Sequence, residues 1–110
     1  MSTNTIVVTV QGSGNGKFYM DGNEGVLALK YGDTYIFDVG DSTNTNKPLF
    51  FSLIQDGIHN SGSNYNFSNF SRSGNVGQSG STIQLTVDIN TPTNLFFYST
   101  NYDGMGNGVL

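Results

Sequence analysis

The most informative stretch of the sequence is Asn94-Leu-Phe-Phe-Tyr-Ser-Thr-Asn-Tyr-Asp-Gly-Met105. Its apolar and aromatic residues 95–98 form a short run that predicts a buried β-strand over residues 95–99. A polar turn follows this run and returns to Met105. In β-sandwich proteins a loop at the end of a buried strand is a common place for a binding site. The stretch therefore predicts a sandwich and the position of its site.

The rest of the chain shows the same preference for strands. Residues 82–89 are the clearest example, because Ile83, Leu85 and Val87 alternate with polar residues. Further strands are expected over residues 6–10, 17–20, 26–31, 34–39 and 48–53. No segment repeats its apolar residues at the period of a helix. We predict one all-β domain over residues 1–110, a sandwich of about seven or eight strands.

Composition excludes several classes of function. Only 11% of the residues are charged and the net charge is −4, so the basic patch that binds nucleic acid is absent. The chain has no cysteine, which excludes disulfides and thiolate metal sites. No apolar run is long enough to cross a membrane, and the N-terminus does not resemble a secretory signal. These features predict a protein that binds neither nucleic acid nor membranes.

The long segment 55–81 is rich in Gly, Asn and Ser and carries three aromatic residues, Tyr65, Phe67 and Phe70. Loops of this length are commonly functional or mobile. One interpretation is that these rings fold back over the sandwich as a lid. The other is that they contact a partner or a neighbouring subunit.

The opening stretch resembles the last strand and ligand loop of cupredoxins, in the version found in structural proteins of tailed phages that infect aquatic bacteria. Those proteins read roughly Leu-Tyr-Tyr-Tyr-Cys-x-x-His-x-Gly-Met-Gly. Their cysteine, histidine and methionine ligands fall on Ser99, Tyr102 and Met105, and an earlier His-Pro step falls on Lys47-Pro48. The hairpin expected over residues 29–39 also resembles this family. The resemblance covers residues 18–107 and implies a cupredoxin-like Greek-key β-sandwich.

Three of the four ligands implied by this resemblance are replaced. A blue-copper centre depends on a thiolate and two imidazoles, and the thioether is a weak axial ligand. Lys47, Ser99 and Tyr102 supply none of these groups, and a lysine cation repels a copper ion. We expect no metal or other cofactor at the vacated positions Lys47, Ser99, Tyr102 and Met105, and an apolar plug there instead.

Candidate catalytic and ion-binding groups are few. His59 is the only histidine, and a surface or packing role is expected because a serine-rich chain places serines near any histidine by chance. The run Asp21-Gly-Asn-Glu-Gly25 hints at a calcium loop but lacks the glycine and glutamate spacing of an EF-hand. A tight turn is therefore expected there, and a weak surface calcium site is the alternative.

The resemblance implies a non-enzymatic structural protein of a bacteriophage virion, assembled in the host cytoplasm. A capsid decoration protein or a tail or fibre component would act through many contacts with the major capsid or tail protein and with copies of itself. The alternative is a module that recognises glycans or a cell surface through Tyr65, Phe67 and Phe70, whose ring faces would stack on sugars.

Overall fold

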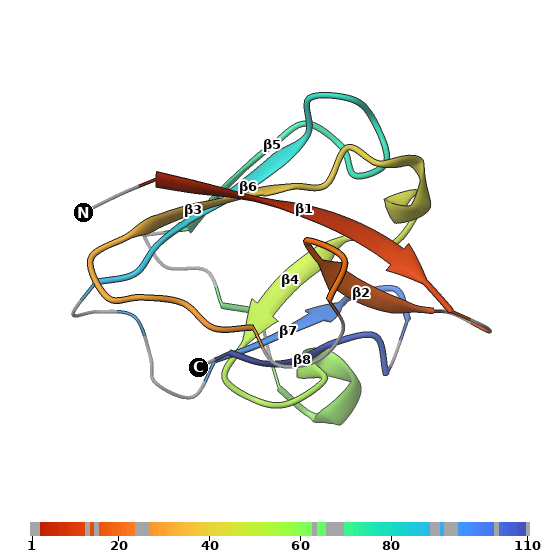
Figure 1. The fold of residues 1–110 in the computed structure, drawn as a ribbon. Coiled ribbons are helices and arrows are strands. Elements are labelled where there is room, and N and C mark those ends of the chain that lie inside the picture. Colours follow the sequence, from red (N-terminus) through yellow and green to blue (C-terminus); the bar gives the residue numbers. More distant parts are fainter. Residues whose placement is uncertain are drawn as a thin grey trace.

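A computed structural model of the chain describes residues 3–12, 14, 16–23, 27–62, 64–65, 70–88, 91, 95–102 and 104–109. The described strands form two sheets (Figure 1), one of five strands in the order β2-β1-β3-β6-β5 and one of three in the order β4-β7-β8. The strands are β1 Thr3–Gln11, β2 Lys17–Met20, β3 Thr34–Asp38, β4 Leu49–Ser52, β5 Phe70–Ser73, β6 Thr82–Thr86, β7 Leu95–Ser99 and β8 Asn107–Val109. The predicted all-β sandwich is confirmed.

Aromatic side chains from both sheets meet in the core. The ring centroids of Phe37 in β3 and Phe51 in β4 lie 5.5 Å apart, and those of Phe18 in β2 and Phe97 in β7 lie 6.4 Å apart. A fully buried side chain of this size contributes about 1.5–3 kcal/mol of transfer free energy. Without disulfides, this packing is the main source of stability.

Strand β1 follows the predicted alternation, since Ile6, Val8 and Val10 are buried and Val7 is exposed. Its first half pairs in parallel with β3, and its second half pairs antiparallel with β2. Strand β3 ends before β1 does, so the last residues of β1 lack a strand on that side. Two side chains of the 3₁₀ turn η1 (Ser42–Asn44) take the place of the missing strand beside these residues.

These two side chains continue the hydrogen bonding of the sheet. The Thr43 hydroxyl accepts a hydrogen bond from the Val10 backbone nitrogen at 2.9 Å. The Asn44 Nδ2 donates to the Val8 carbonyl at 2.8 Å. Asp41 caps η1 by accepting from the Thr43 backbone nitrogen at 2.9 Å, and this bond lowers the Asp41 pKa. Turn η1 is therefore part of the sheet edge.

The prediction of a strand over residues 26–31 is wrong for the described residues 27–31, which form no strand. Val26 lies outside the described residues. Leu27 makes only an isolated parallel bridge to Val109. The hairpin expected over residues 29–39 does not form because β3 pairs with β1 on one edge and with β6 on the other. No edge of β3 remains for residues 27–31, which are instead anchored by a hydrogen bond from the Lys30 nitrogen to the Tyr35 hydroxyl.

The segment 55–81 contains two elements that the sequence did not predict, the 3₁₀ turn η2 (Gly57–Asn60) and β5. Arg72 of β5 links the two sheets. Its Nη1 donates to the Leu49 carbonyl of β4 at 2.6 Å, and its guanidinium lies 4.0 Å from the centroid of the Phe50 ring. Desolvation lowers the Arg72 pKa, but the group remains a cation in the working pH range.

The turn after β2 has the geometry of a tight turn in its described part. Met20 and Asn23 form an isolated antiparallel bridge, and the Asp21 carboxylate accepts from the Val7 backbone nitrogen at 2.7 Å. This carboxylate oxygen therefore has a partner inside the chain. Glu24 and Gly25 of the proposed calcium loop lie outside the described residues.

Candidate functional site

The segments that precede β4 and follow β7 lie side by side at one end of the small sheet. In the antiparallel pairing of β4 with β7, Leu49 lies opposite Ser99. Further along, the Asn101 side-chain amide donates to the Asn46 carbonyl at 2.8 Å. Beyond them, the Lys47 ammonium lies 5.6 Å from the centroid of the Tyr102 ring. Lys47, Ser99 and Tyr102 are therefore gathered at this end.

Met105 reaches the same end from β8. Strand β8 pairs Asn107 with Phe97, and extending this register by two residues places Met105 opposite Ser99. Gly106 makes the close approach possible, because a Cβ there would lie 1.7 Å from the Phe97 carbonyl oxygen. The Met105 side chain is buried in the hydrophobic core, and the Tyr102 ring packs against that core.

The side chains gathered here do not fit a copper ion. They supply an ammonium, a hydroxyl, a phenol and a thioether, of which only the thioether is a usual copper ligand. The Lys47 ammonium is already placed over the Tyr102 ring, an arrangement that is favourable for a cation and an aromatic face. Among the described residues no group of three or more His, Cys, Asp or Glu side chains is close enough to hold a metal ion.

Ser99 is buried, and among the described residues its hydroxyl has no hydrogen-bond partner. A buried hydroxyl without a partner costs free energy. His59 contacts the backbone of the same residue, with its Nε2 2.8 Å from the Ser99 carbonyl oxygen. A carbonyl oxygen only accepts, so Nε2 is the donor in this contact. The imidazole does not contact the Ser99 hydroxyl, and the arrangement of a base that activates a serine is not formed here.

The backbone around η2 is shaped by Tyr98. A Cβ at Gly57 would lie 2.2 Å from the Tyr98 ring, so only glycine fits beneath it. The Tyr98 hydroxyl donates to the Asn64 side-chain carbonyl, and burial raises the pKa of this phenol. The His59 ring packs edge-on against Tyr98 at 6.0 Å between centroids. This packing brings η2 to the end of β7, although the sequence contains no motif that predicts the contact.

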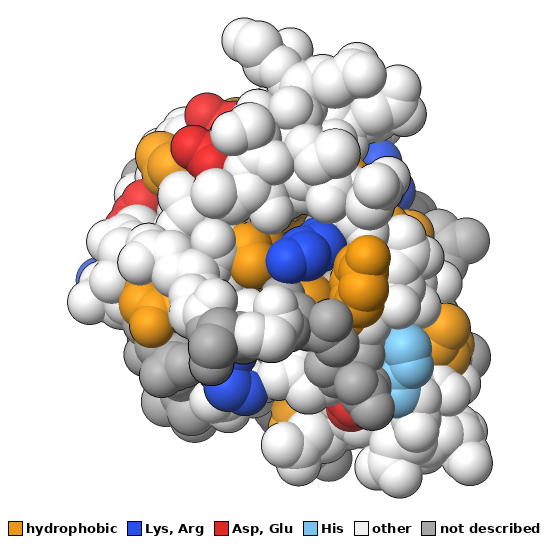
Figure 2. Space-filling view, turned by 90° about the vertical axis from the view of Figure 1, so that its right-hand side faces the viewer, with side chains coloured by type: hydrophobic (Ala, Val, Ile, Leu, Met, Phe, Trp, Pro, Cys, Tyr) orange, Lys and Arg blue, Asp and Glu red, His pale blue; other side chains and the backbone are white. Residues whose placement is uncertain are grey.

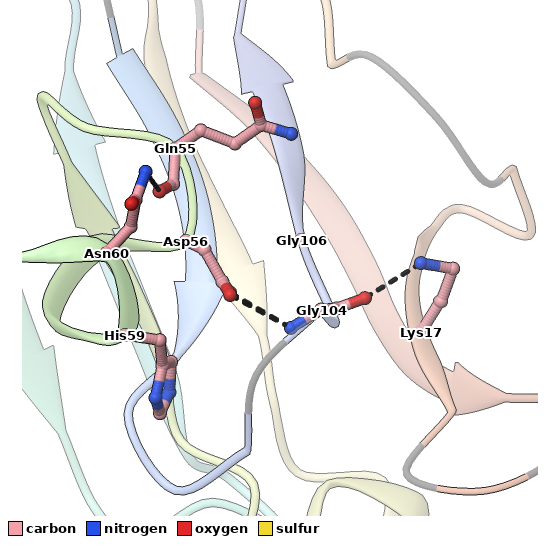
Figure 3. A pocket seen from close by; sticks show the side chains of 7 residues that line it. All are labelled: Lys17, Gln55, Asp56, His59, Asn60, Gly104 and Gly106. Carbon is pink, nitrogen blue, oxygen red and sulfur yellow. Dashed lines mark hydrogen bonds between the residues drawn. The ribbon is translucent and has the colours of Figure 1, made fainter.

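A polar hollow of about 380 Å³ lies beside this packing (Figure 3) and is lined by Lys17, Gln55, Asp56, His59, Asn60, Gly104 and Gly106. The Lys17 ammonium donates to the Gly104 carbonyl at 2.7 Å. From the other side, the Asp56 carboxylate accepts from the Gly104 nitrogen at 3.0 and 3.2 Å. The two opposite charges therefore hold one peptide segment between them.

The aromatic residues of segment 55–81 are used mainly inside the chain. Tyr65 is 3% exposed, so the expectation that it contacts a partner is wrong for the chain in this conformation. Phe70 is partly buried, and its ring centroid lies 5.7 Å from that of Phe51 and 6.4 Å from that of Tyr65. Phe67 lies outside the described residues. Both described rings pack inside the sandwich, Tyr65 as part of the core and Phe70 from strand β5, and neither forms a lid over it.

Apolar side chains are exposed on the segment that follows β4. Leu53, Ile54 and Ile58 are 46%, 43% and 47% exposed. Leu53 and Ile54 also line a shallow hollow of about 400 Å³ together with Ser52, Ser61, Gly62, Asn64 and Tyr65. We refer to Leu53, Ile54 and Ile58 as the apolar patch. Leu53 and Ile54 are adjacent and Ile58 follows in the same segment, and exposed apolar side chains that gather on a surface commonly mark an interaction site.

Comparison of the chain with protein family models, with curated proteins and with solved structures finds no match. Among the described residues, no helix is long and apolar enough to span a membrane.

Proposed function

We propose that this chain is a non-enzymatic structural protein of a virion, built on a cupredoxin-like sandwich whose copper ligands have been replaced. The proposal is supported by the end of the small sheet where Lys47, Ser99, Tyr102 and Met105 occupy the positions that the resemblance assigns to the copper ligands. This end holds the Lys47–Tyr102 pair, the buried Met105 and the buried Ser99 hydroxyl, which has no partner in the described part of the chain. These groups pack the sandwich closed and offer no ligand set for copper. The virion assignment comes from the resemblance to phage structural proteins.

The surface supports a role in protein contacts. Figure 2 shows one face of the molecule, on which charged side chains occupy a few separate points among uncharged polar, hydrophobic and backbone atoms. A surface of low charge can approach copies of itself without strong electrostatic repulsion. The apolar patch then supplies contact free energy, about 1 kcal/mol for each half-exposed aliphatic side chain that becomes covered.

Each such contact binds weakly by itself, but many of them together bind strongly. A capsid decoration protein, or a tail or fibre component, binds a lattice of major capsid or tail protein beside copies of itself. Each added contact raises the effective concentration for the next one. A modest patch on a small domain is therefore sufficient for stable assembly in the virion after folding in the host cytoplasm.

The proposal is tested by the presence and copy number of the chain in purified particles. The Ile54→Glu variant places a charge in the apolar patch and is expected to lower the copy number per particle. Val7→Glu is the matched control, because Val7 on β1 is 46% exposed, similar to Ile54. Loss of particle binding with Ile54→Glu alone supports the proposal. Absence of the wild-type chain from particles would contradict it.

A further inference from the structure

The polar hollow beside η2 has unused hydrogen-bonding groups. Within the described part of the chain, no partner is found for the Gln55 side-chain amide, for His59 Nδ1 or for Asn60 Oδ1. The Lys17 ammonium uses one of its three protons on Gly104, and the Asp56 carboxylate binds a single backbone nitrogen. Figure 3 shows these side chains grouped on the two sides of Gly104.

Four of these side chains are held in place by the backbone. Lys17 and Asp56 are fixed by Gly104, His59 by the Ser99 carbonyl, and Asn60 by a longer bond of 3.4 Å from its Nδ2 to the Gln55 carbonyl. A side chain that is already positioned loses less conformational entropy when a ligand binds. The hollow is thus partly organised for binding before any ligand arrives.

The hollow is lined by one cation, one carboxylate and neutral polar side chains, and this combination favours an uncharged polar ligand. An anion such as phosphate would meet the Asp56 carboxylate, and a metal cation would meet the Lys17 ammonium. An apolar ligand finds no aliphatic or aromatic hydrocarbon side chain among the described residues that line the hollow. A hydroxyl group both donates and accepts hydrogen bonds, so neighbouring hydroxyls can donate a hydrogen bond to the Asp56 carboxylate and accept one from the Lys17 ammonium.

We propose that the hollow formed by Lys17, Gln55, Asp56, His59 and Asn60 binds one ring of a neutral saccharide. Its volume of about 380 Å³ lies in the range of small-molecule sites. This site differs from the aromatic loop considered above, since it reads hydroxyls and does not stack rings. For so small and open a site, the dissociation constant is expected to be about a millimolar or weaker. The site belongs to the single chain and does not depend on the proposed virion role.

The test is a titration of the ¹⁵N-labelled chain, followed by amide chemical shifts, with glucose, galactose, mannose and N-acetylglucosamine in turn. At least one sugar is expected to cause saturable shifts at His59, Asn60 and Gly104. Inorganic phosphate and calcium chloride are titrated in parallel. The proposal is overturned if none of the sugars shifts these amides saturably, or if only phosphate or calcium does.

Variants separate this site from general surface effects. Gln55→Ala and Asn60→Ala remove exposed side chains, and each is expected to weaken sugar binding by about threefold to tenfold, the effect of one hydrogen bond. Gln84→Ala is the matched control, since Gln84 is an exposed glutamine on β6 away from the hollow. Equal affinity of all three variants and the wild type would also overturn the proposal.

Discussion

The replacement of Asn44 by aspartate tests whether η1 is a true part of the sheet. The two side chains have nearly the same shape, so packing is preserved. The amide nitrogen that donates to the Val8 carbonyl at 2.8 Å and to the Asp41 carbonyl at 3.3 Å is replaced by an oxygen. At neutral pH, Asn44→Asp therefore places a buried negative charge against two carbonyl oxygens.

The expected loss of stability follows from these contacts. Leaving the buried Val8 carbonyl without a donor costs about 1–3 kcal/mol. An unpaired buried charge raises the total to about 3–5 kcal/mol at neutral pH. Burial and the facing carbonyls raise the pKa of the new carboxyl in the folded state above its unfolded value near 3.9. The folded state then binds more protons, so the penalty grows as the pH rises through the unfolded pKa and shrinks in acid.

The measurement is urea denaturation of the wild type and the variant from pH 3 to pH 8. Asn101→Asp is the matched control, because Asn101 also donates to a backbone carbonyl at 2.8 Å but is exposed. The control is expected to lose less than about 1 kcal/mol. The reasoning is refuted if Asn44→Asp costs no more than Asn101→Asp, or if its penalty relative to the wild type does not depend on pH.

Three further predictions concern single side chains and are checked by denaturation of purified variants. Arg72→Ala removes the link between β5 and β4 and is expected to lower the free energy of unfolding by about 1–2 kcal/mol. The control Lys30→Ala, at an exposed lysine, is expected to change it by less than about 0.5 kcal/mol. Equal effects of the two variants would show that the link is not stabilising. Ser99→Ala removes a buried hydroxyl for which the described residues offer no partner, and it is expected to leave stability unchanged or to raise it by up to about 1 kcal/mol; a clear loss would mean that the hydroxyl has a partner. Hydrogen bonds from Thr43 lower the Asp41 pKa in the folded state, so the ionised form contributes stability that is lost as the pH falls through that lowered pKa. The stability difference between the wild type and Asp41→Asn should therefore shrink in acid, and a constant difference would refute this origin.

Strand positions with strong local patterns were predicted well from the sequence. Strands β2 and β7 have the predicted bounds 17–20 and 95–99, because each is a short apolar or aromatic run between turn residues. Strand β6 is shorter than the predicted 82–89, since it ends at Thr86, and Ile89 lies outside the described residues. Local pattern identifies a strand well, but pairing partners decide where it ends.

Features that depend on contacts between distant residues were missed. Strand β5 reads Phe-Ser-Arg-Ser, which is too polar to indicate a strand, and it forms because β6 offers a free edge. The contact of His59 with the end of β7 depends on Gly57 lying beneath the Tyr98 ring. A ring and a glycine that meet in this way leave no regular spacing in the sequence. The candidate hollow therefore could not be predicted from the sequence alone.

We propose that this sandwich serves as a structural component of a virion, and purified particles test this directly. The measurement is quantitative mass spectrometry of density-purified particles from infections with the proposed parent phage, calibrated with isotope-labelled peptides. The account predicts many copies of the chain in each particle, in a constant ratio to the major capsid or tail protein. Finding the chain only in the soluble fraction of the infected cells, with none in particles, would contradict it.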